Sequence, residues 1–179
     1  MPEFEILKYR PAYGPLPPQI GATGKAYREG LFVQFKPDNG PGWIGNFAKG
    51  LGGLSTAVKH PNDKAVIVIA NGEGYIVNPD TREVEEMGSS IQQLIDVPEY
   101  RMMIIVDPFT IEALGENGSL WKTHRISVEG IRNIHITGTA LRGEVSDLSG
   151  DWLPFWIDIM TGKKTGGLEP FTEVSLNHR

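Results

Sequence analysis

Residues 65–78 read AVIVIANGEGYIVN and contain the clearest β-hairpin in the chain. The run 65–70 is apolar throughout, residues 71–74 supply the turn, and residues 75–78 return. An Asn-Gly pair takes the positive φ angles of tight turns, and short apolar runs between turn residues are typical of strands. This stretch therefore predicts two antiparallel strands.

The same alternation of short apolar runs and turn residues covers most of the chain. Glycine- and serine-containing turns recur at intervals of about 8–12 residues, which is typical of all-β proteins. The sequence therefore predicts an all-β fold of antiparallel sheets, with about eight to eleven short strands beginning near Leu31. Besides the hairpin, strands are expected at 31–36, 102–106, 120–127, 131–137, 140–145 and 153–160.

Two segments are expected to depart from this pattern. Ser89 to Val97 predicts one short helix, because apolar residues at 91, 94 and 95 share a helical face and a proline follows at 98. The glycine-rich segment 43–54 is expected to be a loop or a short irregular helix.

The prolines divide the chain into three parts. Residues 1–29 hold five of the 13 prolines, and proline lacks the N–H that a sheet interior needs. We expect an extended arm at 1–29, either a free tail or an ordered strap, then a single β domain at 30–170 and a C-terminal tail at 171–179.

The composition excludes several classes of function. The chain has 179 residues, no cysteine and a formal net charge of −5, so disulfides and thiolate metal sites are absent and phosphate-directed binding of nucleic acid is disfavoured. No apolar run reaches the roughly 20 residues of a transmembrane helix, and the N-terminus lacks the pattern of a signal peptide. We expect a cytoplasmic protein that binds neither nucleic acid nor membrane.

Three turns share an Asn/Asp-x-x-Thr pattern after a strand. They begin at Asn78, Asp107 and Asp158 and end at Thr81, Thr110 and Thr161. The Asn or Asp side chain can accept nearby backbone N–H groups, and the threonine hydroxyl can do the same, so a turn role is expected for all six. The strand, turn, strand arrangement resembles the hairpins of β-propeller blades, and this resemblance implies a blade-like or partial-propeller arrangement.

A longer block also resembles a known group. Residues 115–127 read GENGSLWKTHRIS, and residues 161–167 read TGKKTGG. These stretches are similar to a set of small uncharacterised bacterial proteins that share a Gly-x-x-Gly-x-Leu-Trp-x-(Ser/Thr)-x-Arg-(Ile/Leu)-Ser block and a closing Thr-Gly-x-x-x-Gly-Gly. The group has no assigned activity, so the resemblance implies kinship alone.

No catalytic, cofactor or metal motif stands out. His60, His124, His135 and His178 do not lie at metal-ligand spacings, and no Gly-x-Ser-x-Gly elbow or Walker loop is present. We therefore expect no metal and no cofactor.

The tryptophans are the candidate binding residues. Trp152 and Trp156 lie four apart, so they share one face of a strand, while Phe155 lies on the other. That strand is either central in the core or exposes an aromatic patch to a partner. Trp43, expected in a loop, is a further candidate, and Trp121 completes the set.

From these features we expect a non-enzymatic binding or protein-interaction module. Open sheet edges need covering, so a homo-oligomer, most simply a dimer, or a protein partner is expected. One alternative is a small hydrolase or ligand-modifying enzyme with a pocket near Trp43 and His60 or His124. Another is a toxin-inhibiting, immunity-type protein.

Overall fold

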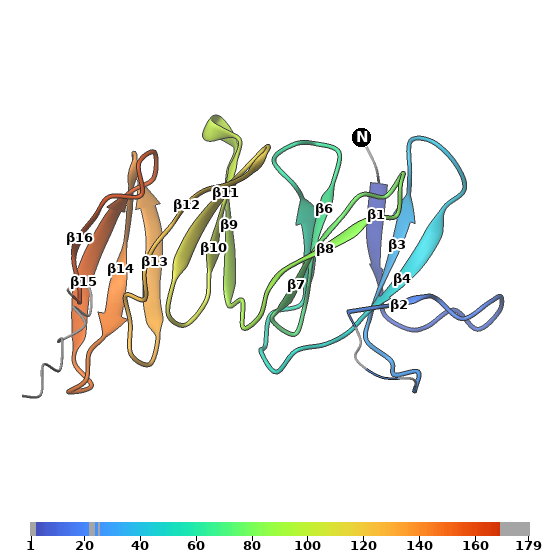
Figure 1. The fold of residues 1–179 in the computed structure, drawn as a ribbon, viewed down its shortest axis with the longest axis horizontal. Coiled ribbons are helices and arrows are strands. Elements are labelled where there is room, and N and C mark those ends of the chain that lie inside the picture. The colour runs from blue at the N-terminus through green and yellow to red at the C-terminus, as the bar shows by residue number, and fades with distance from the viewer. Residues whose placement is uncertain (1–2, 22–23, 25, 169–179) are drawn as a thin grey trace, which may run out of the picture.

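The computed structural model describes residues 3–21, 24 and 26–168. Within them, sixteen strands form four four-stranded sheets, which lie side by side along the long axis of the molecule (Figure 1). One 3-10 turn, η1 (Pro98–Tyr100), is the sole helical element of the described residues. The all-β prediction is therefore confirmed, although the strands are more numerous than expected.

The sheets follow one another along the chain. Sheet A holds, in spatial order, β1 (Glu3–Leu7), β3 (Leu31–Lys36), β4 (Trp43–Phe47) and β2 (Gln19–Ile20). Sheet B is the meander β5 (Thr56–Lys59), β6 (Val66–Ala70), β7 (Glu73–Val77) and β8 (Val84–Gly88). Sheet C is β9 (Gln93–Val97), β10 (Met102–Val106), β11 (Ile111–Gly115) and β12 (Gly118–Lys122). Sheet D is β13 (Ile131–Thr137), β14 (Ala140–Ser146), β15 (Trp152–Asp158) and β16 (Lys164–Gly166).

The core consists of three apolar layers, one between each pair of neighbouring sheets. Strand β6 shows how the sequence builds them: Val66, Val68 and Ala70 face sheet A, whereas Ile67 and Ile69 face sheet C. Side chains alternate across a strand, so a strand with a sheet on both sides must be apolar at every position. The continuous apolar run at 65–70 therefore belongs to an inner sheet.

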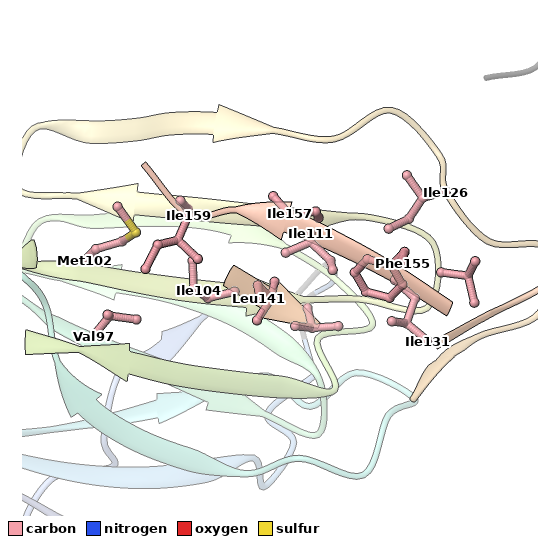
Figure 2. Close-up of a cluster of buried hydrophobic side chains, with 13 residues drawn as sticks. Val97, Met102, Ile104, Ile111, Ile126, Ile131, Leu141, Phe155, Ile157 and Ile159 are labelled. Atoms are coloured by element: carbon pink, nitrogen blue, oxygen red, sulfur yellow. The ribbon is translucent and has the colours of Figure 1, made fainter. Parts of the chain in front are cut away.

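The layer between sheets C and D is shown in Figure 2. Met102 and Ile104 of β10 meet Leu141 of β14 and Phe155 and Ile157 of β15. Phe155 is only 1% exposed. Sheet D has no further sheet beyond it among the described residues, so its other face is an outer face.

The predicted helix at 89–97 is wrong. Ser90 has a φ of +61°, which breaks a helix, and residues 93–97 form β9 antiparallel to β10. Leu94 packs into the layer between sheets B and C, and Ile95 into the layer between C and D. The apolar spacing reflects a strand between two sheets.

The loop or irregular helix expected at 43–54 is also incorrect at its start, because residues 43–47 form β4. The expectation that strands begin at Leu31 is likewise wrong. Strand β1 pairs with β3, and β2 pairs in parallel with β4, so residues of the proline-rich segment supply both edges of sheet A. The expected tail at 171–179, with His178, lies outside the described residues.

Candidate protein interface on the fourth sheet

The Asn/Asp-x-x-Thr turns have the expected hydrogen bonds. The Asp158 carboxylate accepts the backbone N–H of Met160 at 3.1 Å and both the N–H and the hydroxyl of Thr161 at 2.9 Å. The Thr161 hydroxyl is the main cause of the lowered pKa of Asp158, followed by the two backbone N–H groups.

The other two turns have the same contacts from the backbone, but the Thr81 hydroxyl donates to Glu83 at 2.8 Å and not to Asn78. Asn78 accepts the N–H of Asp80 at 3.0 Å and that of Thr81 at 3.3 Å. Asp107 accepts the N–H of Thr110 at 2.6 Å and its hydroxyl at 2.5 Å. All three turns thus fix the chain direction after a strand.

Two of the candidate tryptophans connect neighbouring sheets. The indole N–H of Trp43 in sheet A donates to the carbonyl of Pro79 in sheet B at 2.9 Å. Trp121 of sheet C donates in the same way to Ile159 of sheet D at 2.8 Å. Each accepting carbonyl belongs to the residue directly after the Asn or Asp of a turn, so the turn motif and the tryptophan together hold adjacent sheets.

Trp43 is not on a loop, as the sequence suggested, but at the start of β4. It is 9% exposed, stacks on Phe35 with ring centroids 4.5 Å apart, and has the Arg82 guanidinium 5.5 Å from its ring. Trp121 is half-buried and shares with Trp43 the indole hydrogen bond to the next sheet, so both side chains make contacts within the molecule.

The remaining two tryptophans share the outer face of sheet D. Trp152, Pro154 and Trp156 alternate along β15 with the inward-facing Leu153 and Phe155. Trp156 is 48% exposed. Trp152 is half-buried, so Trp156 is the exposed indole on this face.

Charged residues on β13 and β14 continue this face beside the tryptophans. In the register of the sheet, Arg142 lies opposite Trp156, and Glu144 lies opposite Pro154. Arg132 ion-pairs with Glu144 at 2.8 Å, and its guanidinium stands 3.9 Å from the ring of Trp152. The hydrogen bond from Arg132 is the main cause of the lowered pKa of Glu144.

Arg142 differs from Arg132. It is exposed, and no ion pair or hydrogen bond joins its guanidinium to another of the described residues. Sequence reasoning found the tryptophans of this face but missed Arg132, Arg142 and Glu144. The alternation of residues 140–146 could have indicated them once β14 was placed beside β15.

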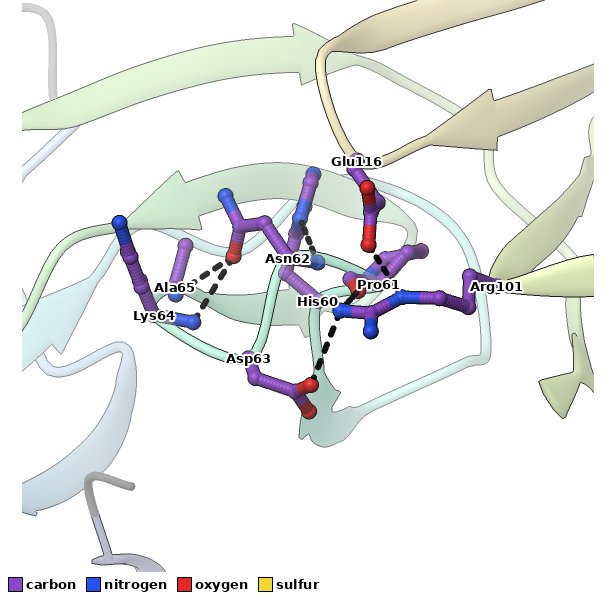
Figure 3. A network of polar contacts seen from close by, with 8 residues as sticks. All are labelled: His60, Pro61, Asn62, Asp63, Lys64, Ala65, Arg101 and Glu116. Carbon is purple, nitrogen blue, oxygen red and sulfur yellow. Dashed lines mark hydrogen bonds and ion pairs between the residues drawn. The ribbon is translucent and has the colours of Figure 1, made fainter.

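A second candidate region is a groove of about 540 Å³ between sheets B and C. His60, which is 4% exposed, lines it together with Glu85, Glu86, Glu112 and Lys122. Figure 3 shows the loop that carries His60.

That loop is held from two directions. The Asn62 N–H donates to Nδ1 of His60 at 3.1 Å, which leaves the ring proton of the neutral tautomer on Nε2. Arg101, from the neighbouring sheet C, contacts the Pro61 carbonyl at 3.2 Å, Asp63 at 3.1 Å and Glu116 (Figure 3). Burial lowers the pKa of His60, although the Asn62 side chain and the charge of Glu85 oppose this shift.

The lowered pKa predicts a pH-dependent stability. Between the lowered pKa and the ordinary value of 6.5, the unfolded chain binds more protons at His60 than the folded chain does. The contribution of His60 to the free energy of unfolding is therefore full above about pH 6.5 and is lost as the pH falls. We expect urea unfolding between pH 7.5 and pH 5 to show this loss in the parent chain and not in His60→Gln. The exposed His124→Gln should behave as the parent does, and an equal effect of both substitutions would contradict the assignment.

The other histidines do not join His60. His124 follows β12 and is exposed, and His135 lies on the outer face of sheet D with its Nδ1 2.9 Å from the Asn133 carbonyl. Among residues 3–21, 24 and 26–168, no cluster of three or more His, Cys, Asp or Glu residues could hold a metal ion. Nor does that part of the chain contain a helix with the length and apolarity to cross a membrane.

Comparisons with known proteins give no family. No protein-family model matches the chain, and no curated protein matches it. Among solved structures, it is similar to the extracellular domain of BT4673 from B. thetaiotaomicron, with a TM-score of 0.46 and 13% identity over 75% of this chain and 21% of that one. It is also similar to a eukaryotic initiation factor, with a TM-score of 0.43 and 11% identity over 77% of this chain and 40% of that one. The chain thus spans less than half the length of either protein.

Proposed function

We propose that this protein is a non-enzymatic interaction module that binds a protein on the outer face of sheet D. One observation carries the proposal: Trp156 and Arg142 lie side by side in the sheet, both exposed, and the guanidinium has no ion-pair partner among the described residues. Tryptophan and arginine are the residue types most enriched where a few contacts supply most of the binding energy.

A comparison with the opposite end of the molecule also favours sheet D as the binding face. The outer face of sheet A carries part of the proline-rich segment, since a groove of about 430 Å³ there is lined by Gln34 and Ile44 of the sheet and by Pro11, Tyr13 and Leu16. The outer face of sheet D has no comparable cover among the described residues. Within the described part of the chain, sheet D therefore provides the uncovered end face of the stack, where a partner could bind.

Affinity capture from the producing cells tests the proposal. Trp156→Ala should capture at least about tenfold less partner protein than the parent chain, because a central aromatic contact contributes about 2 kcal/mol or more to binding. Leu51→Ala, at a fully exposed site on the loop between sheets A and B, should leave capture unchanged. Equal capture by the parent chain, Trp156→Ala and Leu51→Ala, with equal melting temperatures, would overturn the proposal.

Two finer features belong to this proposal. The stack of four-stranded sheets is blade-like, which is supported by the succession of meanders in sheets B, C and D. A cytoplasmic location is supported by the absence of cysteine. An immunity-type inhibitor of a toxin would be one form of such a module.

A hydrolytic site is the second candidate, and the groove between sheets B and C is the observation that favours it. Buried His60 is near Glu85 in this groove, and Glu112 also lines it. A neutral imidazole beside carboxylates is suited to acid–base chemistry. Trp43 lines a different groove from His60. Turnover of ester or amide substrates that is lost in His60→Gln would support this candidate.

A further inference from the structure

The outer face of sheet D carries a pattern that is complementary to itself. Along β14, a cation at Arg142 is followed two residues later by an anion at Glu144. Along β15, Trp156 lies opposite Arg142 and Pro154 lies opposite Glu144. The face thus has two adjacent rows about 7 Å apart along the strands. One row holds Arg142 and Trp156, and the other holds the Arg132–Glu144 ion pair and Pro154.

A twofold axis placed between these rows matches each row with the other. If two copies stack their outer faces about an axis that runs across the strands, β14 faces β14 in opposite directions. Arg142 of each copy then faces the second copy's Glu144, and Trp156 faces the second copy's Pro154. Arg132 and Asn133 of its own chain both donate to Oε2 of Glu144, so Oε1 is the oxygen that would accept from Arg142. Both charge pairs form at once, as a symmetric interface requires.

We propose that the outer face of sheet D binds the same face of a second copy of this chain, so that the protein is a twofold-symmetric dimer. This inference rests on the proposed function, since it names the partner of that same surface. The second copy would extend the stack of sheets, because sheets A, B, C and D already pack face to face within one chain. It would also give the Arg142 guanidinium a carboxylate.

Charge reversal in mixtures tests this pairing. Arg142→Glu places two anions opposite each other at both ends of the interface. Glu144→Arg places two cations there and also removes the ion pair with Arg132 of the same chain. Each variant alone should raise the dimer dissociation constant at least about tenfold, because like charges across an interface are strongly unfavourable. An equimolar mixture should restore the dimer, since both pairs are then of opposite charge in the mixed species.

The readout is sedimentation velocity with one variant fluorescently labelled, at about 100 µM total chain, where weak dimers are populated. Glu99→Arg, in the exposed turn η1, is the matched control and should not change the mass. Melting temperatures identify any variant that fails to fold, and Trp156→Ala then serves as a second way to remove the interface.

The outcomes separate the two proposals. A dimer that survives both reversals, or a mixture that stays monomeric although both variants fold, overturns the twofold pairing. A parent chain that is monomeric but captures a different protein through Trp156 overturns the dimer and leaves the proposed function standing. A monomer whose capture is unaffected by Trp156→Ala overturns both.

Discussion

Phe155→Ala is expected to lower the free energy of unfolding by about 3–5 kcal/mol, as the loss of a buried phenylalanine does in other cores. The ring lies in the layer between sheets C and D and is 1% exposed. It rests against Gly143, where an added Cβ would lie 2.9 Å from a ring carbon. The glycine has no side chain to fill the cavity, so little of the loss can be recovered by relaxation.

The neighbouring residue provides the control. Trp156→Ala removes a larger side chain, but from the outer face of the same strand, so at submicromolar concentration it should change the free energy of unfolding by less than about 1 kcal/mol. Guanidinium unfolding of both variants measures the difference. Equal destabilisation would mean that the two faces of β15 have been assigned wrongly.

Gly30→Ala is expected to destabilise the protein by about 3 kcal/mol or more, because the new methyl group has no space. A Cβ at Gly30 would overlap the carbonyl oxygen of Phe47 and lie 2.8 Å from Oδ1 of Asn46. Relief would require β3 to move from β4, which breaks the 2.7 Å hydrogen bond from the Gly30 N–H to buried Asn46. Overpacking and an unsatisfied buried polar group each cost about 1–3 kcal/mol.

Gly53→Ala is the matched substitution for this test. Its Cβ would meet no atom within 4 Å, and its φ lies outside the left-handed region. Alanine at such a position restricts the unfolded chain, so the stability should stay the same or rise by about 0.4–1 kcal/mol. Thermal and urea unfolding measure the stability of the two glycine variants. Equal changes in stability for Gly30→Ala and Gly53→Ala would contradict the packing described at Gly30.

Much of the fold can be predicted from local signals. The hairpin at 65–78 combines apolar runs with an Asn-Gly turn, and it forms β6 and β7. The Asn/Asp-x-x-Thr turns depend on side chains within three residues of one another, so short-range reasoning is sufficient for them. The outward direction shared by Trp152 and Trp156 follows from the two-residue period of a strand.

The failures come from long-range structure. The apolar residues at 91–97 suit a helix by spacing, but β9 lies in a sheet with other sheets on both sides, and this requires apolar residues on both of its faces. The loop assigned to Trp43 failed for a similar reason: its indole reaches Pro79, 36 residues away, and no local pattern indicates that bond. The ladder of Arg142 and Trp156 likewise depends on the register between β14 and β15.

The order of the sheets also bears on how the chain folds. In sheets B, C and D every hydrogen-bonded strand pair is consecutive in sequence, so each sheet can form from its own segment with short loop closures. Among the described residues, sheet D packs on sheet C alone, through a single apolar layer. We therefore expect hydrogen exchange to reveal a partly unfolded form in which residues 131–166 open as one cooperative unit while sheets A and B stay protected. The molecule would then come apart from one end, as repeat arrays do, and not as a whole.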